Sequence, residues 1–206
     1  MTYVIAFDFE TFGPIPSVNG FTQLGAVVGC LSTGRVVDVF GQYASQQGYY
    51  PDNDCIESFW LKNPERYQET LTACSISTYT PYDVIELFLK WVSKHVEQRG
   101  SSIYLITDCS TFDSGILKSF SLQSTLKIVT KYPRDIIDTC PFYLGVAGLY
   151  MTEEQVDSSS FEMARKKLGL PVFKSATHSE HDHNPINDST VIFEKWKFIN
   201  DGLVGN

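Results

Sequence analysis

Cysteine is scarce in this sequence, and the cysteines that are present form no recognisable pattern. The 206-residue chain contains five, none in Cys-x-x-Cys spacing: Cys30, Cys55, Cys74, Cys109 and Cys140. An odd and scattered set argues against a disulfide framework and against a zinc knuckle. We therefore expect most of them to be buried thiols that behave as small apolar side chains.

The sequence also lacks a long hydrophobic run. No stretch approaches the roughly 20 consecutive apolar residues that span a bilayer, and the N-terminus has no basic region followed by an apolar segment. These features predict a cytoplasmic protein with no membrane partner.

Positive charge is in short supply. There are 16 Lys and Arg residues against 24 Asp and Glu, which gives a formal net charge of −8. This balance argues against a protein that holds nucleic acid along an extended basic surface. Nucleic acid as a substrate remains open, because bound divalent cations would cancel local negative charge and a strand end needs few phosphate contacts.

What the chain has in full measure is apolar residues, at 43% of the sequence, which is enough for one core. The apolar run Tyr3–Phe7 predicts a strand buried on both faces. Gly13–Pro16 is typical of a turn, and two further strands are expected over Phe21–Leu31 and Arg35–Tyr43, joined by a hairpin at 32–34. Together they predict a mostly antiparallel meander.

Helical patterns and further strands alternate through the remainder of the chain. We expect strands over Ser102–Thr107 and Leu126–Val129. One helix is expected over Asp54–Lys62 with Asp54 as its cap, a second from Pro64, and a third from Pro81 to a stop at Gly100. Further helices are expected over Ser114–Phe120, Thr139–Tyr150 and Phe161–Leu168, and a last one from Pro185. The intervening 153–160 and 175–183 are expected to be loops. One α/β domain over residues 1–206, with a mixed sheet flanked by helices, fits this order.

The first strand ends in a pair of acids. Side chains alternate along a strand, so Asp8 and Glu10 point to one face and Phe9 points to the other. Two carboxylates at the end of a buried strand repel each other unless a cation lies between them. Carboxylate oxygens suit hard cations such as Mg²⁺ or Mn²⁺. The simpler alternative is an acidic surface loop.

Two more acids stand where a helix begins. Asp113 follows the strand over 102–107 and opens a helix, and Asp188 lies five residues after His183 in the first turns of the last helix. A helix N-terminus stabilises a carboxylate there. Taken alone, Asp113 is explained as a helix cap and Asp188 as a solvent-facing or capping acid.

Taken together, the order Asp8-x-Glu10, Phe112-Asp113 and His183-x₄-Asp188 resembles the DEDDh superfamily of 3′–5′ exonucleases, which have a ribonuclease H-like fold. The resemblance covers most of the chain, and His183 in place of a tyrosine selects the histidine branch. The segment Ile137-Asp138-Thr139 also resembles the family and is interpreted as structural. The segment 56–63 is similar to phage exonuclease A, ribonuclease T and oligoribonuclease, whereas Asp108-Cys109 replaces the His-Asn of many relatives.

The resemblance implies a reaction and the residues that carry it. Two divalent ions, Mg²⁺ or Mn²⁺, would be held by Asp8, Glu10, Asp113 and Asp188, with Asp8 bridging them, and His183 would accept the proton of the attacking water. The implied activity is hydrolysis of single-stranded DNA or RNA from the 3′ end to nucleoside 5′-monophosphates. Neither the polymer nor its length is indicated by any residue type.

Substrate contacts are also predicted by the resemblance. Thr11 and Phe12 follow the first motif and would surround the terminal nucleotide, and Phe59 or Trp60 would stack on a base. We expect at least one of these two aromatic residues to belong to the core instead. Ribonuclease T-like relatives form dimers, so a homodimer is a further option that these residues do not decide.

Three alternatives stay open. His178, His181 and His183 imitate a transition-metal site, although their spacing fits no familiar zinc motif and a polar loop is the simpler explanation. His181 competes with His183 as the general base, but only His183 has the five-residue offset from Asp188. The alternatives to an independent exonuclease are a proofreading module that depends on a partner and an inactive nucleic-acid-binding module of the same fold.

Overall fold

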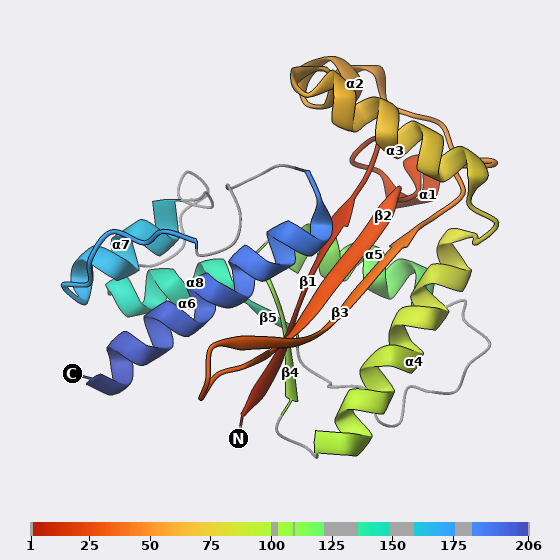
Figure 1. The fold of residues 1–206 in the computed structure, drawn as a ribbon. Coiled ribbons are helices and arrows are strands. Elements are labelled where there is room, and N and C mark those ends of the chain that lie inside the picture. The colour runs from red at the N-terminus through yellow and green to blue at the C-terminus, as the bar shows by residue number, and fades with distance from the viewer. Residues whose placement is uncertain are drawn as a thin grey trace.

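The computed structural model describes residues 2–99, 103–108, 110–121, 136–148, 159–175 and 183–205, and these form a mixed sheet with helices on both faces (Figure 1). The sheet has the order β3-β2-β1-β4-β5. Its strands are β1 (Tyr3–Glu10), β2 (Gln23–Cys30), β3 (Arg35–Tyr43), β4 (Ile103–Thr107) and β5 (Ile136–Asp138). β1, β2 and β3 pair antiparallel, and β4 and β5 continue the sheet parallel to β1.

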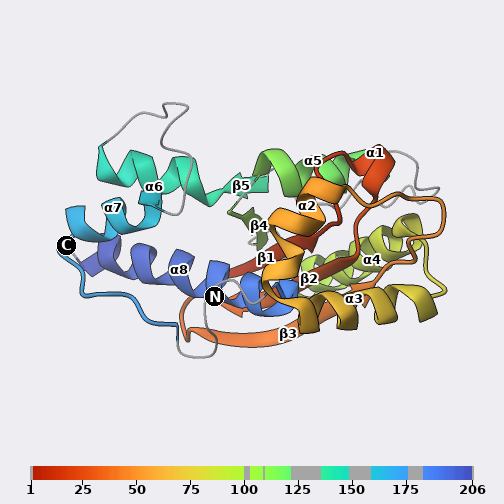
Figure 2. The same ribbon diagram turned by 90° about the horizontal axis from the view of Figure 1, so that it is seen from above.

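The helices divide between the two faces of the sheet and one end of it (Figures 1 and 2). They are α1 (Pro16–Asn19), α2 (Asn53–Ser58), the 3₁₀ helix η1 (Trp60–Lys62), α3 (Pro64–Ile76), α4 (Pro81–Arg99), α5 (Ser110–Ser121), α6 (Thr139–Ala147), α7 (Ser159–Lys167) and α8 (Pro185–Gly205). None of the helices in the described ranges combines the length and apolarity needed to cross a membrane.

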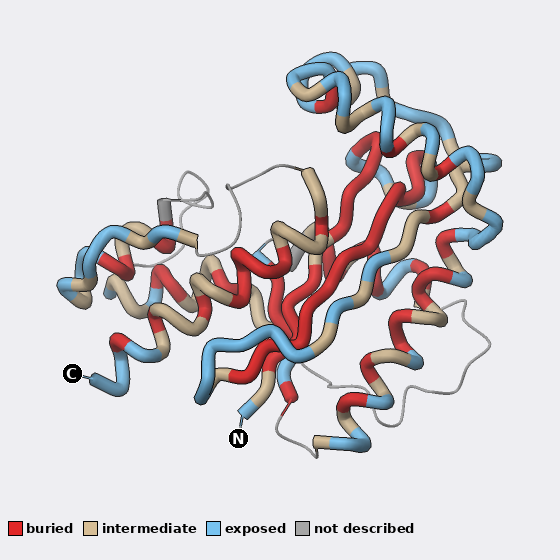
Figure 3. Tube along the Cα trace, viewed as in Figure 1, coloured by how far each residue is buried: buried red, intermediate tan, exposed pale blue. Residues whose placement is uncertain are grey.

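Two apolar cores follow from the alternation of side chains in the central strands. Ile5, Phe7 and Phe9 of β1 join the core beneath α4 and α5. Val4 and Ala6 face the other way and pack with α6, α7 and α8. Figure 3 shows that β1 and β2 are buried along their length while the edge strand β3 is largely exposed. Asp8 and Glu10 continue the series of Val4 and Ala6, so they face α8.

Some expected elements differ from the structure. The helix predicted over 54–62 is split, because the chain turns at Phe59 and inserts Trp60 into the interior, and its cap is Asp52, whose side chain accepts from the Cys55 amide at 2.8 Å. Pro16 begins α1 rather than ending a turn. α6 ends at Ala147 because Gly148 adopts a left-handed conformation with φ of 74°.

Other expectations are extended or untested. Asp138 completes the short strand β5 and caps α6 by accepting from the Cys140 amide at 2.9 Å, which is a structural role. α5 begins at residue 110 and α7 at residue 159, each earlier than predicted. The strand predicted over Leu126–Val129, the stop at Gly100 and most of the loops over 153–160 and 175–183 lie outside the described residues.

Candidate active site

The last residues of β1 present two carboxylates to the start of α8. Glu10 is buried with 7% exposure, and Asp8 is half-buried. Asp188 lies in the first turn of α8, and one carboxylate oxygen from each of these three acids lies within 4.8 Å of the others. The strand alternation predicted for Asp8 and Glu10 is therefore confirmed.

Glycine in β2 lets α8 approach this closely. Gly25 is paired with Asp8 in the sheet, and a Cβ on Gly25 would lie 2.3 Å from the carbonyl carbon of Pro185. The Ser189 hydroxyl donates to the Gly25 carbonyl at 3.0 Å. A larger residue at position 25 would push away the first turn of α8, and Asp188 with it.

A second group of acids collects at the ends of β1 and β4. Asp113, in the first turn of α5, is 1% exposed and accepts hydrogen bonds from the Thr107 hydroxyl and from the Phe9 amide at 3.4 Å. Asp108 directly follows β4. Asp8, Asp108 and Asp113 each place one carboxylate oxygen within 4.8 Å of the others.

Asp108 is the site residue that the sequence analysis missed. In the sequence it stands out only because Asp108-Cys109 replaces the His-Asn of related sequences. The available signal was its position, because β4 is parallel to β1 and Asp108 follows β4 much as Asp8 ends the apolar run of β1. Carboxyl ends of neighbouring parallel strands meet at one edge, where ligand sites form in α/β sheets.

The two groups of acids bring several carboxylates close together around Asp8. Burial raises the pKa of Asp8 well above its usual value, and the neighbouring carboxylates of Asp113, Glu10, Asp108 and Asp188 raise this pKa further. Burial also raises the pKa of Asp113, and the Thr107 hydroxyl opposes that shift only in part. Such a cluster is costly when ionised and favours cations brought from outside the chain.

The donor set fits hard divalent cations. Within the described residues, the groups that could hold a metal contain only carboxylates, and both of them include Asp8. Oxygen-only ligands favour Mg²⁺ or Mn²⁺ over Zn²⁺. Asp8 would thus be shared by two cation positions, one with Glu10 and Asp188 and the other with Asp108 and Asp113.

A pocket of about 460 Å³ opens next to Glu10. Its wall is formed by residues that follow β1, such as Thr11, by residues around α2, such as Asp54, Cys55 and Phe59, and by Phe112 of α5. Phe59 is 38% exposed, so one aromatic surface is available there.

Comparison with known proteins finds no matching protein-family model and no matching curated protein. Solved structures do match. The nuclease domain of 3′hExo, a DEDDh family member bound to rAMP, superposes with a TM-score of 0.65 at 19% identity, over 97% of this chain and 92% of that one. Cell-death related nuclease 4 (CRN-4) matches with a TM-score of 0.61 at 13% identity, over 98% and 64% of the two chains.

Escherichia coli exonuclease I in complex with a dT13 oligonucleotide is also similar, with a TM-score of 0.59 at 12% identity. The match covers all of this chain and 43% of that one. This chain has the same fold as these solved structures. The predicted ribonuclease H-like arrangement of a mixed sheet flanked by helices is confirmed.

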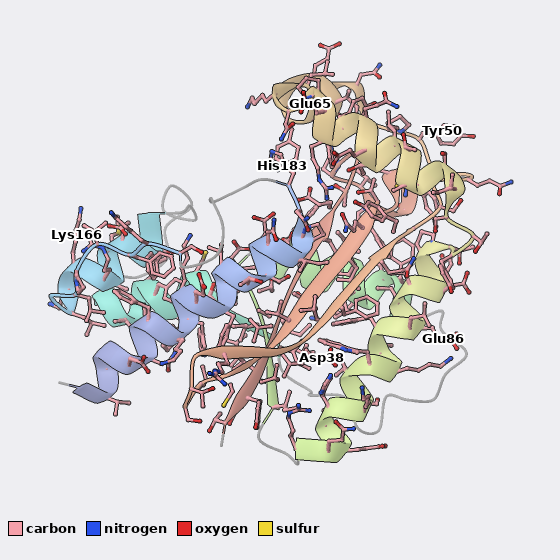
Figure 4. All side chains as sticks on the ribbon, in the orientation of Figure 1. Asp38, Tyr50, Glu65, Glu86, Lys166 and His183 are labelled. Carbon is pink, nitrogen blue, oxygen red and sulfur yellow. The ribbon has the colours of Figure 1, made fainter. Side chains whose placement is uncertain are left out.

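His183 lies just before α8, which begins at Pro185, and beneath the segment that carries α2 and α3 (Figure 4). Its ring packs on Phe59 with a centroid distance of 4.2 Å, and the ring of Trp60 lies at 6.0 Å. Its backbone is left-handed, with φ of 57°. His178 and His181 lie outside the described residues, so the zinc alternative and the choice between His181 and His183 stay as predictions.

Two of the predicted substrate contacts lie in the interior of the fold. Trp60 is completely buried, and its Nε1 donates to the Thr11 carbonyl at 2.8 Å. Phe12 is 2% exposed and packs against Trp60 and Tyr67. Neither ring offers a face to a base, because each is covered by its neighbours. Trp60 is thus the core member expected of the aromatic pair, and Thr11 and Phe59 are the two that reach the pocket wall.

Proposed function

We propose that this protein is a metal-dependent 3′–5′ exonuclease that hydrolyses single-stranded DNA or RNA and releases nucleoside 5′-monophosphates. The observation that carries the proposal is the sharing of Asp8 between two carboxylate groups at one end of the sheet. The similar structures support a nucleic-acid substrate, since their bound partners include rAMP, a histone mRNA stem-loop and dT13. These partners include both RNA and DNA, so the preferred polymer is left to experiment.

In this proposal the acids hold two divalent ions, Mg²⁺ or Mn²⁺. Asp8, Glu10 and Asp188 would hold one, and Asp8, Asp108 and Asp113 the other. When bound, the two ions supply a nucleophile at neutral pH and neutralise charge on the phosphate and the leaving oxygen. The Thr107 hydroxyl and the Phe9 amide fix the orientation of the Asp113 carboxylate before any cation binds.

The remaining residues bind the strand end and move the proton. Thr11 and Phe59 line the pocket beside Glu10, where Phe59 would stack on the base without regard to its identity. His183 would accept the proton of the attacking water at a ring nitrogen, because an imidazole titrates near neutral pH. Phe12 and Trp60 support this wall from within the core.

The test compares three proteins on 5′-labelled single-stranded DNA and RNA of equal sequence, with Mg²⁺, Mn²⁺ or EDTA. Wild type should produce a ladder that shortens from the 3′ end only with metal. Asp8→Asn, which keeps the shape and removes the charge, should lose on the order of 10³-fold in rate. Asp201→Asn is the matched control, since Asp201 is an exposed acid at the far end of α8 that pairs with Lys197.

Two outcomes would count against the proposal. Equal activity of Asp8→Asn and wild type would show that the cleavage does not use this site. Intact strands in every lane would favour the alternative of a partner-dependent or inactive binding module. That alternative is already less favoured, because Asp8, Glu10, Asp113, His183 and Asp188 are all chemically competent.

A further inference from the structure

Arg66, on α3, makes three hydrogen bonds that reach into the site. Its Nε donates to the His183 carbonyl at 2.8 Å, its Nη1 to the Tyr43 hydroxyl at 3.1 Å, and its Nη2 to Gln23 Oε1 at 2.9 Å. The Arg66 side chain is only 12% exposed. One guanidinium thus connects α3, the strands β2 and β3, and the segment just before α8.

The partners of this guanidinium are unusual for a nearly buried positive charge. All three hydrogen-bond acceptors are neutral, and the nearby carboxylate of Glu69, at 3.5 Å, is 69% exposed and well solvated. Gln23 is paired directly with Glu10 between β1 and β2. The contact with Gln23 therefore ties His183 to the part of the sheet that carries the first acids.

The backbone of His183 needs such support. Among the described residues, His183 is the only non-glycine residue with positive φ. The left-handed region is disfavoured for residues with a Cβ and persists where surrounding contacts impose it. Arg66 holds the carbonyl of this residue, and Phe59 contacts its ring at a centroid distance of 4.2 Å.

We infer that Arg66 is a positioning residue: it fixes the left-handed backbone of His183 and thereby sets where the imidazole lies relative to Phe59 and the acids. The catalytic consequence rests on the proposed nuclease function. The positional effect does not, because it follows from the hydrogen bonds and ring contacts alone.

The structural test is NMR of the histidine ring Cε1–Hε1 groups in the full chain, with the His183 signal assigned from His183→Asn. In wild type, the rings of Phe59 and Trp60 should displace the His183 signal from its exposed-histidine position. Arg66→Met keeps the apolar stem and removes the donors, so the displacement should be lost. Arg66→Lys retains a single cationic donor group and should restore part of it.

Arg165→Met is the matched control. Arg165, on α7, is 8% exposed and donates to the Leu170 carbonyl at 2.8 Å while pairing with Glu162. It therefore combines a buried stem with a carbonyl contact, as Arg66 does, but contacts nothing in the candidate site. Its loss should lower the melting temperature and leave the His183 signal unchanged.

The kinetic test uses the same variants. Arg66→Met should lower kcat by about 100-fold, the scale expected when a reacting group is displaced by about 1 Å. KM should change little, because Arg66 does not line the pocket. The limb of the pH–rate profile that reports the general base should flatten, and Arg66→Lys should recover part of kcat.

The outcomes separate the two claims. An unchanged His183 signal in Arg66→Met, or an equal change in Arg165→Met, would overturn the positioning role. If wild type has no nuclease activity but its His183 signal is displaced and this displacement is lost in Arg66→Met, the positioning role is supported and the proposed function is overturned. If Arg66→Met does not fold, the signal of Arg66→Lys against wild type decides the question in the same way.

Discussion

Two aspartates in this molecule meet opposite surroundings. Asp38, on β3, lies against α4 (Figure 4). Its carboxylate accepts hydrogen bonds from Trp91 Nε1 at 3.2 Å and from the Val39 amide at 2.9 Å, and it lies 2.9 Å from His95 Nε2. Burial raises its pKa, but these donors outweigh burial and lower it overall. Asp8, on β1, has a raised pKa because burial and other carboxylates act together.

The difference shows which region is complete within the chain. The Asp38 region contains its own donors and positive charges, with Lys94 at 3.9 Å and Arg99 beside His95. Asp8 is surrounded by other carboxylates instead, which carry charges of the same sign. Structural networks satisfy their charges internally, whereas a binding site leaves a charge for its ligand to neutralise. This contrast favours a cation site at Asp8 and a stabilising role at Asp38.

The strongest test of the contrast is the response of stability to Mg²⁺ or Mn²⁺. A cation at 100 times its dissociation constant should stabilise wild type by about 2.7 kcal/mol. Asp8→Asn should be more stable than wild type without metal, because it relieves repulsion, and should respond little to metal. Asp38→Asn should lose stability under both conditions and keep the full metal response.

Urea unfolding of the three proteins with metal and with EDTA measures these differences. A metal response in Asp8→Asn equal to that of wild type would remove the distinction between the two regions.

A finer test concerns Asp108. Asp108 belongs to the second group of acids, so Asp108→Asn should weaken Mn²⁺ binding by about 10-fold. This is the lower end of the range for residues that tune a metal site, because Asp108 is exposed. Electron paramagnetic resonance titration of free Mn²⁺ measures this directly. Asp54→Asn is the control, since Asp54 is an acid of the pocket beside Glu10 and belongs to neither group of acids. An equal loss in both variants would reduce Asp108 to a contributor of general negative charge.

The smallest effect should be the pH dependence of stability that arises from His95 and Asp38. Burial lowers the pKa of His95, and Arg99 lowers it further. Asp38 raises this pKa by less, and Lys94 lowers it slightly. The unfolded chain therefore takes up this proton first, so stability should fall as the pH drops from the unfolded value of about 6.5 towards the folded one. Stability from Asp38 should be lost at lower pH, as the pH falls from its unfolded value through its lowered folded pKa.

The measurement is the melting temperature between pH 7 and pH 5 in EDTA, for wild type and His95→Gln. In this window the melting temperature of wild type should fall relative to that of His95→Gln, because both proteins share the opposite contribution of Asp8 and Asp113, whose pKa values are raised. Parallel curves would show that His95 does not contribute to the pH dependence.

Local patterns predicted the elements that depend on neighbouring residues. The unbroken apolar run of β1, the hairpin after β2, the Pro-led starts of α3, α4 and α8, and the acids of the DEDDh pattern were all visible in the sequence. The break at Phe59 was not, because it depends on the buried position of Trp60 and on its hydrogen bond to Thr11, 49 positions earlier in the chain.

The sequence by itself predicted a mixed sheet flanked by helices from the order of its elements, and most candidate site residues from the resemblance of its short motifs to the DEDDh superfamily, since both are properties of short segments. Only the tertiary structure decided that Asp108 joins Asp8, that Gly25 admits α8, and that Arg66 holds the backbone of His183. Each of these contacts joins segments far apart in the chain. Their distances are set by how strands pair and helices pack, and no local pattern records them.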